Sequence, residues 1–232
     1  MKTVLCILTL NELECLKEVF PNIPKPGKKS GYDEIYAIDG GSTDGTLEYF
    51  EKNKIKIVTQ DKRGRGNAFL QAFKKIKADT YIFFSPDGNE DISDLSKFRK
   101  YVEAGADLVI ASRMMKGAYN EEDAQLIKPR KWANLSFNLM ANLSFRRKGP
   151  YVTDSINGYR AITSKMAKEL SLDAHGYTIE YQMTMRALKK GANIVEFPTR
   201  EGQRISGEIQ AKSIPTGLKF IKCYCTELLK KA

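Results

Sequence analysis

An apolar run in the sequence ends at Ser85, in a turn rich in the oxygen atoms that metal ions prefer. The segment 81–91 reads Y-I-F-F-S-P-D-G-N-E-D, so the side chains of Asp87, Asn89, Glu90 and Asp91 follow a predicted strand. Mg²⁺ and Mn²⁺ take oxygen ligands and commonly share them with substrate phosphates. The alternative is an acidic turn in which Asp91 or the serine at 93 caps the next helix. The turn alone leaves both possibilities open.

A second polar segment, A-I-D-G-G-S-T-D-G-T at 37–46, also follows a predicted strand. Asp39 at the strand end could accept hydrogen bonds from a base or a ribose, and the neighbouring glycines permit close approach of a ligand. Ser42 or Asp44 could cap the following helix. The alternative is a tight turn between strand and helix that serves geometry alone.

A third segment, K-R-G-R-G-N-A at 62–68, is a basic loop at the start of a predicted helix. Such a loop suits phosphate, because the helix N-terminus and the basic side chains act together. The spacing of a Walker A loop is absent. We therefore expect Lys62, Arg65 and Gly66 to contact phosphates in some other arrangement.

These segments are joined by an alternation of strands and helices in the first half of the chain. Strands are predicted over 2–9, 33–38, 55–59, 80–85 and 107–111, and helices over 12–20, 44–53, 67–76 and 93–103. This order predicts a mostly parallel sheet with helices on both faces. Ligands of such sheets bind outside the carboxyl ends of the strands. The polar clusters at 9–12, 39–46 and 87–91 should therefore converge on one crevice.

The second half is less regular. Helices are predicted over 132–145, 164–170 and 178–190, a strand over 192–198, an amphipathic tail helix from 213, and loops over 113–131 and 151–161. The helix at 132–145 has no charged residue, is too short to cross a bilayer, and is flanked by K-P-R-K and R-R-K. It could belong to the core or lie in a membrane interface, and the tail helix presents the same alternatives.

Composition narrows the possible partners. The chain has 232 residues with 42% hydrophobic content, a formal net charge of +10 and a pI of about 9.3. This charge suits anionic partners, and no nucleic-acid-binding signature is visible, so we expect no nucleic acid partner. The four cysteines lack zinc or disulfide spacing. With no signal peptide or membrane-spanning run apparent, we expect a cytoplasmic protein with reduced thiols.

Together these segments resemble the family 2 glycosyltransferases, which have the GT-A fold. T-L-N-E (9–12), I-D-G-G-S-T-D-G-T (38–46), G-R-G-N-A (64–68) and S-P-D-G-N-E-D (85–91) are similar in order and spacing to that family's elements. A-S-R (111–113), T-D-S-I-N-G-Y-R-A (153–161) and R-I-S-G-E (204–208) resemble its polyprenol-phosphate branch, which includes the dolichol-phosphate mannose synthases. The resemblance covers roughly residues 1 to 212.

The resemblance implies an α/β GT-A domain over 1–212, with a mostly parallel central sheet and helices on both faces. A Rossmann-like nucleotide-binding half would span 1–112, an acceptor half 113–212, and the amphipathic tail helix 213–232. It implies that the nucleotide-sugar donor contacts Thr9, Asn11, Glu12, Asp39, Gly41, Ser42, Asp44, Lys62, Arg65, Gly66 and Asp87.

The chain departs from the family pattern at two positions. Gly40 stands where the family usually has a second Asp, so nucleotide contacts there would depend on Asp39. The family's D-x-D becomes Asp87-Gly-Asn89. In the branch, a third oxygen ligand lies two residues later, where this chain has Asp91. The implied site for Mg²⁺ or Mn²⁺ is therefore Asp87, Asn89 and Asp91.

The acceptor can be considered from its chemistry. A sugar hydroxyl needs a positioned general base, whereas a phosphate monoester is already anionic and needs orientation. Family members that use hydroxyl acceptors tend to carry a Glu-Asp pair, where this chain has Thr153-Asp154. Arginine suits phosphate through its planar fork. The candidate acceptor-phosphate residues are Arg113, Arg130, Arg160, Arg204 and Lys212, and the predicted catalytic set is Asp87, Asp154, Arg113 and Arg204.

The resemblance thus implies an inverting, metal-dependent transfer of a sugar from a nucleotide-sugar donor to a polyprenyl phosphate. The enzyme would attach peripherally to the cytoplasmic face of a membrane or to a membrane-anchored partner. One alternative is transfer to a sugar hydroxyl in polysaccharide or glycolipid assembly. The other is a nucleotide-sugar-binding domain that has lost turnover, which the residues at 40 and 89 keep open.

Overall fold

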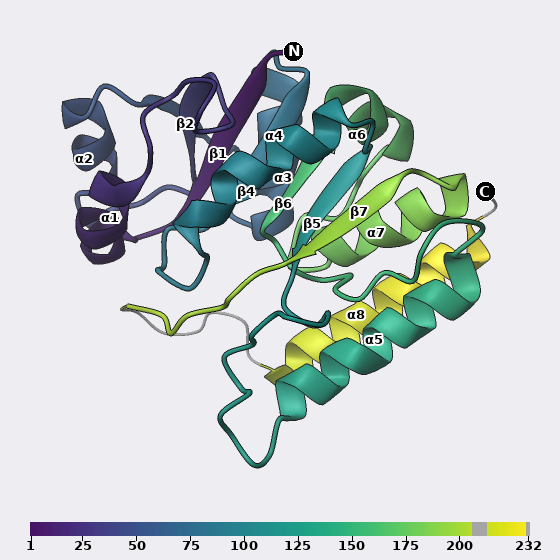
Figure 1. The fold of residues 1–232 in the computed structure, drawn as a ribbon. Helices are drawn as coiled ribbons and strands as arrows, with labels where there is room; N and C mark the ends of the chain where they lie inside the picture. Colours follow the sequence, from purple (N-terminus) through teal and green to yellow (C-terminus); the bar gives the residue numbers. More distant parts are fainter. Residues whose placement is uncertain (206–212, 231–232) are drawn as a thin grey trace.

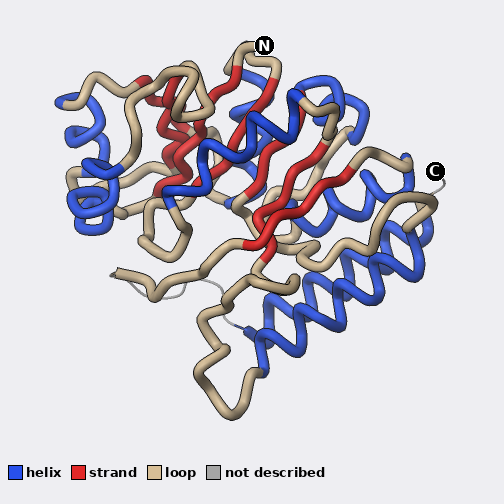
Figure 2. The backbone as a smooth tube through the Cα atoms, in the orientation of Figure 1, coloured by secondary structure: helices blue, strands red, loops and turns tan. Residues whose placement is uncertain are grey.

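A seven-stranded sheet runs through the part of the chain that the computed structural model describes, residues 1–205 and 213–230 (Figures 1 and 2). The strands are β1 Thr3–Thr9, β2 Glu34–Asp39, β3 Lys56–Thr59, β4 Thr80–Phe84, β5 Leu108–Ser112, β6 Arg160–Thr163 and β7 Ile194–Pro198. Their order is β3-β2-β1-β4-β6-β5-β7. Only β6 runs antiparallel to its neighbours, β4 and β5. The predicted mostly parallel sheet is confirmed.

Helices cover both faces of this sheet. They are α1 Leu13–Val19, α2 Thr46–Lys52, α3 Arg65–Lys75, α4 Leu95–Glu103, α5 Pro129–Phe145, α6 Ser164–Leu170, α7 Ile179–Lys190 and α8 Ser213–Leu229, with 3₁₀ helices η1 Phe20–Asn22 and η2 Ile92–Asp94. Buried side chains of α1, α2 and α4 pack on one face, and those of α3, α5, α6, α7 and α8 on the other. Strand β1 feeds both cores, because its side chains alternate between the two faces. It therefore reads as a continuous apolar run.

Strand β6 is the element that the sequence did not predict. It begins at Arg160, within the segment 151–161 expected to be a loop, and lies between β4 and β5. It has four residues, the first of which is an arginine, and three of the four are buried. A strand this short, covered on both faces, shows no alternation of polar and apolar residues, so no periodic signal marks it.

The carboxyl ends of the parallel strands meet at one edge of the sheet. Thr9 of β1 lies opposite Asp39 of β2, which in turn lies opposite Thr59 of β3. The segments after β5 and β7 leave at the same edge, because these two strands are parallel to each other and point in the same direction as β4. The three polar clusters of the first half therefore converge as predicted.

Helices α5 and α8 lie side by side and run in the same direction (Figure 1). The ring of Phe137 packs against that of Phe220, and further along both helices the ring of Phe145 packs against that of Tyr224. Within the described residues, no helix combines the length and the apolar composition needed to cross a membrane.

Candidate functional site

A cavity of about 620 Å³ opens at the carboxyl edge of the sheet. Its walls come from the segments after β1, β2, β4 and β5, from the first turns of α3, α5, α7 and α8, and from the residues that follow β7. The cavity therefore joins the two halves of the chain, as expected for a site that holds two substrates.

The acidic turn after β4 presents oxygen atoms to this cavity. Asp87 and Asn89 line it, and Asp87 is almost fully buried. Asn89 Oδ1 is buried and has no hydrogen-bond partner among the described residues. Glu90 accepts a hydrogen bond from the Ser85 amide at 2.8 Å. Its burial, with the Asp87 carboxylate nearby, raises the pKa of Glu90 well above its usual value.

Asp91 does not reach the cavity. Its Oδ1 accepts the Ser93 amide at 2.9 Å and caps η2, and its backbone carbonyl accepts the Tyr159 hydroxyl at 2.9 Å. The capping alternative therefore describes Asp91 in this structure. Of the three residues in the predicted metal set, Asp87 and Asn89 line the cavity and Asp91 does not. Within residues 1–205 and 213–230, no group of three or more Asp, Glu, His or Cys side chains is arranged to hold a metal. An unpartnered amide oxygen beside a carboxylate nevertheless fits a divalent cation that takes its other ligands from a diphosphate.

Arg204 lies over this acidic turn. Its Nη1 is 2.9 Å from Asp87 Oδ2, and its Nη2 is 2.6 Å from Glu12 Oε1. The backbone of residues 202–205 also lies against the acidic turn. The Ile205 amide donates to the Asp87 carbonyl at 2.9 Å, and the Gly202 amide donates to the Asn89 carbonyl at 2.8 Å. Arg204 was predicted to hold the acceptor phosphate. The structure places its guanidinium against Asp87 and Glu12, and the acceptor-phosphate role stays a prediction.

The carboxylate of Asp39 is fully used inside its own turn. Its Oδ1 accepts the amides of Gly41 and Ser42 at 2.7 and 2.8 Å. Its Oδ2 accepts the hydroxyls of Ser42 and Thr9 at 2.6 and 3.1 Å. These four bonds fill the acceptor positions of a carboxylate, and Asp39 is fully buried. Asp39 therefore fixes the turn and does not reach the cavity, which corrects its predicted contact with a base.

Asn11 and Asp44 connect the same turn to α1 and α2. The Thr43 amide donates to Asn11 Oδ1 at 2.9 Å, and Asp44 accepts the amides of Leu13 and Thr46, each at 3.0 Å. Of the eight residues predicted to bind the donor within 9–12, 39–46 and 62, only Thr9 and Glu12 line the cavity; the other six, Asn11, Asp39, Gly41, Ser42, Asp44 and Lys62, do not.

Three residues that the sequence did not single out line this end of the cavity. They are Leu10, Gln60 and Arg63, and they stand beside Gly40. Arg63 Nη2 donates to the Gly41 carbonyl at 3.2 Å. Arg63 belongs to the basic loop at 62–68 that the sequence did identify, but only the fold shows which basic residues of that loop line the cavity.

The first turn of α3 packs against the backbone of 174–175. A Cβ on Gly66 would lie 2.1 Å from the Ala174 carbonyl oxygen, and the Asn67 amide donates to the His175 carbonyl at 3.1 Å. Gly66 does not line the cavity, whereas Gly64 and Arg65 at the same helix start do. The phosphate contacts expected at this helix N-terminus stay a prediction.

Arg65, like Arg63, is a member of the basic loop that lines the cavity. It forms an ion pair with Glu180 of α7, and its Nη1 donates to Ser85 Oγ at 3.3 Å. A Cβ on Gly158 would lie 1.8 Å from Arg65 Nη2, so the guanidinium lies directly against the backbone at 158. Although burial opposes its charge, the Glu180 carboxylate raises the pKa of Arg65 above its usual value.

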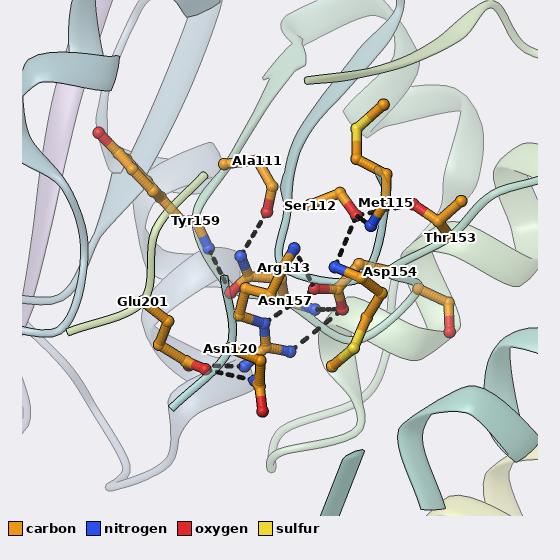
Figure 3. Close-up of polar contacts among 12 residues, drawn as sticks. Ala111, Ser112, Arg113, Met115, Asn120, Thr153, Asp154, Asn157, Tyr159 and Glu201 are labelled. Atoms are coloured by element: carbon orange, nitrogen blue, oxygen red, sulfur yellow. Dashed lines mark hydrogen bonds and ion pairs between the residues drawn. The ribbon is translucent and has the colours of Figure 1, made fainter. Parts of the chain in front are cut away.

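Arg113 lines the cavity within a network of paired charges (Figure 3). Its Nε and Nη2 donate to the two carboxylate oxygens of Asp154 at 2.8 and 3.1 Å, and its Nη1 donates to Glu201 at 2.8 Å. Asn120 donates to the other oxygen of Glu201 at 2.6 Å. Asp154, which was predicted to be catalytic, is fully buried behind Arg113 and does not line the cavity. In this structure its carboxylate holds the Arg113 guanidinium in place.

Arg130 lies in the first turn of α5 and lines the same end of the cavity. Its Nη1 is 3.2 Å from Glu121 Oε1, and its side chain is 42% exposed. Its predicted acceptor-phosphate role stays a prediction. Lys212, predicted for the same role, lies outside the described residues.

Arg160 is buried in the protein interior. Its guanidinium donates to the carbonyls of Asn157, Glu180 and Ser155 and to the Thr184 hydroxyl, at 2.6 to 3.3 Å. Burial lowers the pKa of Arg160 to about 10, and the carboxylates of Glu180 and Asp154 oppose that decrease. Because the side chain is fully buried, its predicted contact with an acceptor phosphate is wrong.

We expect Arg160→Met to reduce the free energy of unfolding by about 3 to 5 kcal/mol, because it leaves several buried acceptors without a donor. Denaturant unfolding measures this change. Arg130→Met is the matched control, and it should alter the free energy of unfolding by less than about 0.5 kcal/mol. Equal stability of the two variants would contradict the interior role of Arg160.

Comparison with known proteins shows which family this chain belongs to. The family described as Glycosyl transferase family 2 matches residues 4–166. Glycosyltransferase AglJ of Haloferax volcanii is 30% identical over 211 residues, which are 87% of this chain and 64% of that protein. The polyprenol monophosphomannose synthase of Mycolicibacterium smegmatis is 27% identical over 220 residues, which are 89% of this chain and 79% of that protein.

Among solved structures, glucosyl-3-phosphoglycerate synthase from Mycobacterium tuberculosis, in complex with Mn²⁺, UDP and phosphoglyceric acid, superposes with a TM-score of 0.74. The match covers 100% of this chain and 80% of that chain at 16% identity, and therefore concerns the fold. The family and the fold predicted from the sequence are both confirmed. The chain belongs to glycosyl transferase family 2 and is a glycosyltransferase with the GT-A fold.

Proposed function

We propose that this protein transfers a sugar from a nucleotide-sugar donor to a polyprenyl phosphate, with inversion and with a divalent cation. It would act at the cytoplasmic face of a membrane. The observation that carries the proposal is that one cavity is lined both by the oxygen-bearing side chains of Asp87 and Asn89 and by the guanidinium groups of Arg113 and Arg130. A relative is named polyprenol monophosphomannose synthase, which supports the same acceptor class.

The donor would occupy the end of the cavity nearest β1, β2 and β4. The nucleoside would lie along Thr9, Leu10, Gly40 and Gln60, which line that wall. Arg65 would stand beside the diphosphate, because Glu180 and the backbone at 158 hold its guanidinium facing the cavity. A fixed cation at that place stabilises charge that develops on a departing diphosphate.

Asp87 and Asn89 would hold Mg²⁺ or Mn²⁺. When bound, the cation would neutralise negative charge on the leaving diphosphate. Arg204 pairs with Asp87 Oδ2 in this structure, and the carboxylate keeps further lone pairs with which it could bind a metal. Arg204 would then stand next to the cation and the diphosphate, so it is proposed as a donor-side residue.

A phosphate acceptor fits the opposite end of the cavity. Arg113 and Arg130 would orient the phosphate, whose anionic oxygen attacks the anomeric carbon from the side opposite the leaving group, which inverts the configuration. Two carboxylates line this end, Glu121 and Glu201, and each is already ion-paired with an arginine. This pairing favours an acceptor that needs orientation over a hydroxyl that needs a general base.

The test is a panel of nucleotide sugars with a short-chain polyprenyl phosphate, assayed with Mn²⁺, with Mg²⁺ and after chelation. A glycolipid with a free hydroxyl serves as the competing acceptor. We expect transfer to the phosphate, loss of turnover with chelator, and an inverted anomeric configuration of the product by NMR. Transfer to the hydroxyl acceptor alone would replace the proposed acceptor class. Donor binding without turnover on either acceptor would favour a binding domain.

Arg130→Ala should raise the KM for polyprenyl phosphate roughly tenfold, because a charge-assisted contact with the acceptor is lost. Donor affinity should stay within about twofold, since Arg130 lies at the far end of the cavity. Steady-state kinetics with each substrate varied in turn measures both quantities. Lys131→Ala, one residue later on α5, is the control, because Lys131 pairs with Asp123 and does not line the cavity.

A further inference from the structure

Helices α5 and α8 carry apolar side chains on the surface that faces away from the sheet. These are Trp132, Leu135, Leu139 and Leu143 on α5, and Leu218, Ile221, Cys225 and Leu228 on α8, all exposed. We propose that this surface, the α5–α8 face, binds an anionic lipid bilayer and lies in its headgroup region. The proposal rests on the proposed function, because it supplies the location of a lipid-linked acceptor.

The periodicity of α5 separates two faces. Asn138, Ala141, Asn142 and Phe145 are buried against the domain. The residues at 132, 135, 139 and 143 recur at helical spacing on the other side, and Leu143 is 78% exposed. The exposed side of α5 is therefore more apolar than its buried side, which includes two asparagines, and packing within the domain does not account for it.

Helix α8 repeats this arrangement beside α5. Phe220 and Glu227 are buried, whereas Leu218 is 63% exposed and Leu229 is 86% exposed. The two helices lie side by side and run in the same direction, so their outer faces form one surface (Figure 1). The segment before α5 extends it with two further exposed apolar side chains, Leu126 and Ile127. Exposed apolar surface of this extent is unusual for a protein that contacts only water.

The charges around the α5–α8 face select its partner. Arg146, Arg147 and Lys148 follow α5, and Lys219 and Lys222 lie on α8, all exposed. Helix α5 has no acidic residue, and the one in α8, Glu227, is buried and paired with Arg186. An apolar surface edged by cations matches the headgroup region of an anionic bilayer. Two copies brought together through this face would oppose like charges.

The cavity reaches the beginning of the α5–α8 face. Arg130 and Asn134 of α5 and Thr216, Lys219 and Phe220 of α8 line it. A phosphate held by Arg130 would therefore leave its hydrocarbon chain only a short distance from Trp132 and Leu218. A lipid-linked acceptor could therefore keep its hydrocarbon chain on the α5–α8 face while its phosphate lies in the cavity.

The experiment is flotation of the full chain with phosphatidylcholine vesicles that contain or lack phosphatidylglycerol, in the absence of substrates. We expect binding to the anionic vesicles that weakens as salt rises. Leu139→Glu/Leu143→Glu should lower the partition coefficient at least about tenfold. Arg147→Glu/Lys222→Glu should also lower it by more than about tenfold, since each cation near an anionic surface contributes about fivefold. Lys28→Glu/Lys52→Glu, an equal charge change at exposed residues elsewhere, is the control and should change it less than about twofold.

Thermal unfolding checks that each variant is folded, and turnover with a short-chain acceptor in detergent separates the two proposals. If the variants lose vesicle binding but keep this turnover, both proposals are supported. Turnover without any vesicle binding by the unaltered chain would overturn docking and leave the proposed function intact. Vesicle binding without turnover would support docking and overturn the proposed function. Self-association that Leu139→Glu/Leu143→Glu abolishes, with no vesicle binding, would assign the face to a second copy instead.

Discussion

Asp87→Asn is expected to lower turnover at saturating donor by roughly 10²- to 10³-fold, the scale of losing one group that stabilises transition-state charge. Asp87 is a buried carboxylate that lines the cavity two residues before Asn89, whose side-chain oxygen has no hydrogen-bond partner within residues 1–205 and 213–230. The substitution keeps the size of the side chain but removes the charge that would hold a divalent cation. Steady-state kinetics measures the loss, and Mn²⁺ titration followed by electron paramagnetic resonance measures metal affinity independently of turnover.

Asp91→Asn is the matched control, with the same chemical change four residues later. Asp91 caps η2 through the Ser93 amide, and asparagine caps helices almost as well as aspartate. We expect turnover and Mn²⁺ affinity within about threefold of the unaltered protein, and stability within about 1 kcal/mol. A loss at Asp91 equal to that at Asp87 would show that the turn rearranges when metal binds, and would restore Asp91 to the ligand set.

The sequence predicted the sheet well because three of its strands are buried on both faces and appear as apolar runs. Strand β1 is buried at every position, and so are β4, which pairs with β1, and β5, which pairs with β6 and β7. Polar residues at the ends of parallel strands also had to meet at one edge, so the crevice followed from topology. Strand β6 was not predicted, because its formation depends on pairing with β4 and β5, which are distant from it in sequence.

The composition of the candidate site was less predictable than its location. Asp39 and Asp91 were expected to bind ligands, but in the structure their carboxylates accept hydrogen bonds from nearby amides, and that of Asp39 also from hydroxyls. Sequence spacing cannot tell a carboxylate that faces a cavity from one that caps a turn three residues away. Arg160 and Arg204 illustrate the same limit over longer distances, because their partners come from segments far along the chain.

Gly158→Ala is the second substitution for which we expect a large effect, although residue 158 has no side chain to touch a substrate. A Cβ there would lie 1.8 Å from Arg65 Nη2 and 3.1 Å from Glu180 Oε1, so the guanidinium must move. Because Arg65 lies in the donor end of the cavity, we expect kcat/KM for the donor to fall about 10²-fold, the scale of a misplacement near 1 Å. Steady-state kinetics measures this loss, and calorimetry with the nucleoside diphosphate measures the loss of affinity.

A double-mutant cycle distinguishes displacement of Arg65 from a general disturbance of the fold. If Gly158→Ala acts through Arg65, it should add less than about threefold to the loss already caused by Arg65→Ala. Gly27→Ala is the matched control, because a Cβ at 27 meets no atom within 4 Å and the residue lies outside the cavity. Multiplicative losses in the double variant would show that position 158 affects donor binding by another route. Non-additive losses would mean that the two substitutions act through the same group. The role of Gly158, within I-N-G-Y-R at 156–160, would then be to leave space for the Arg65 guanidinium beside the donor phosphates.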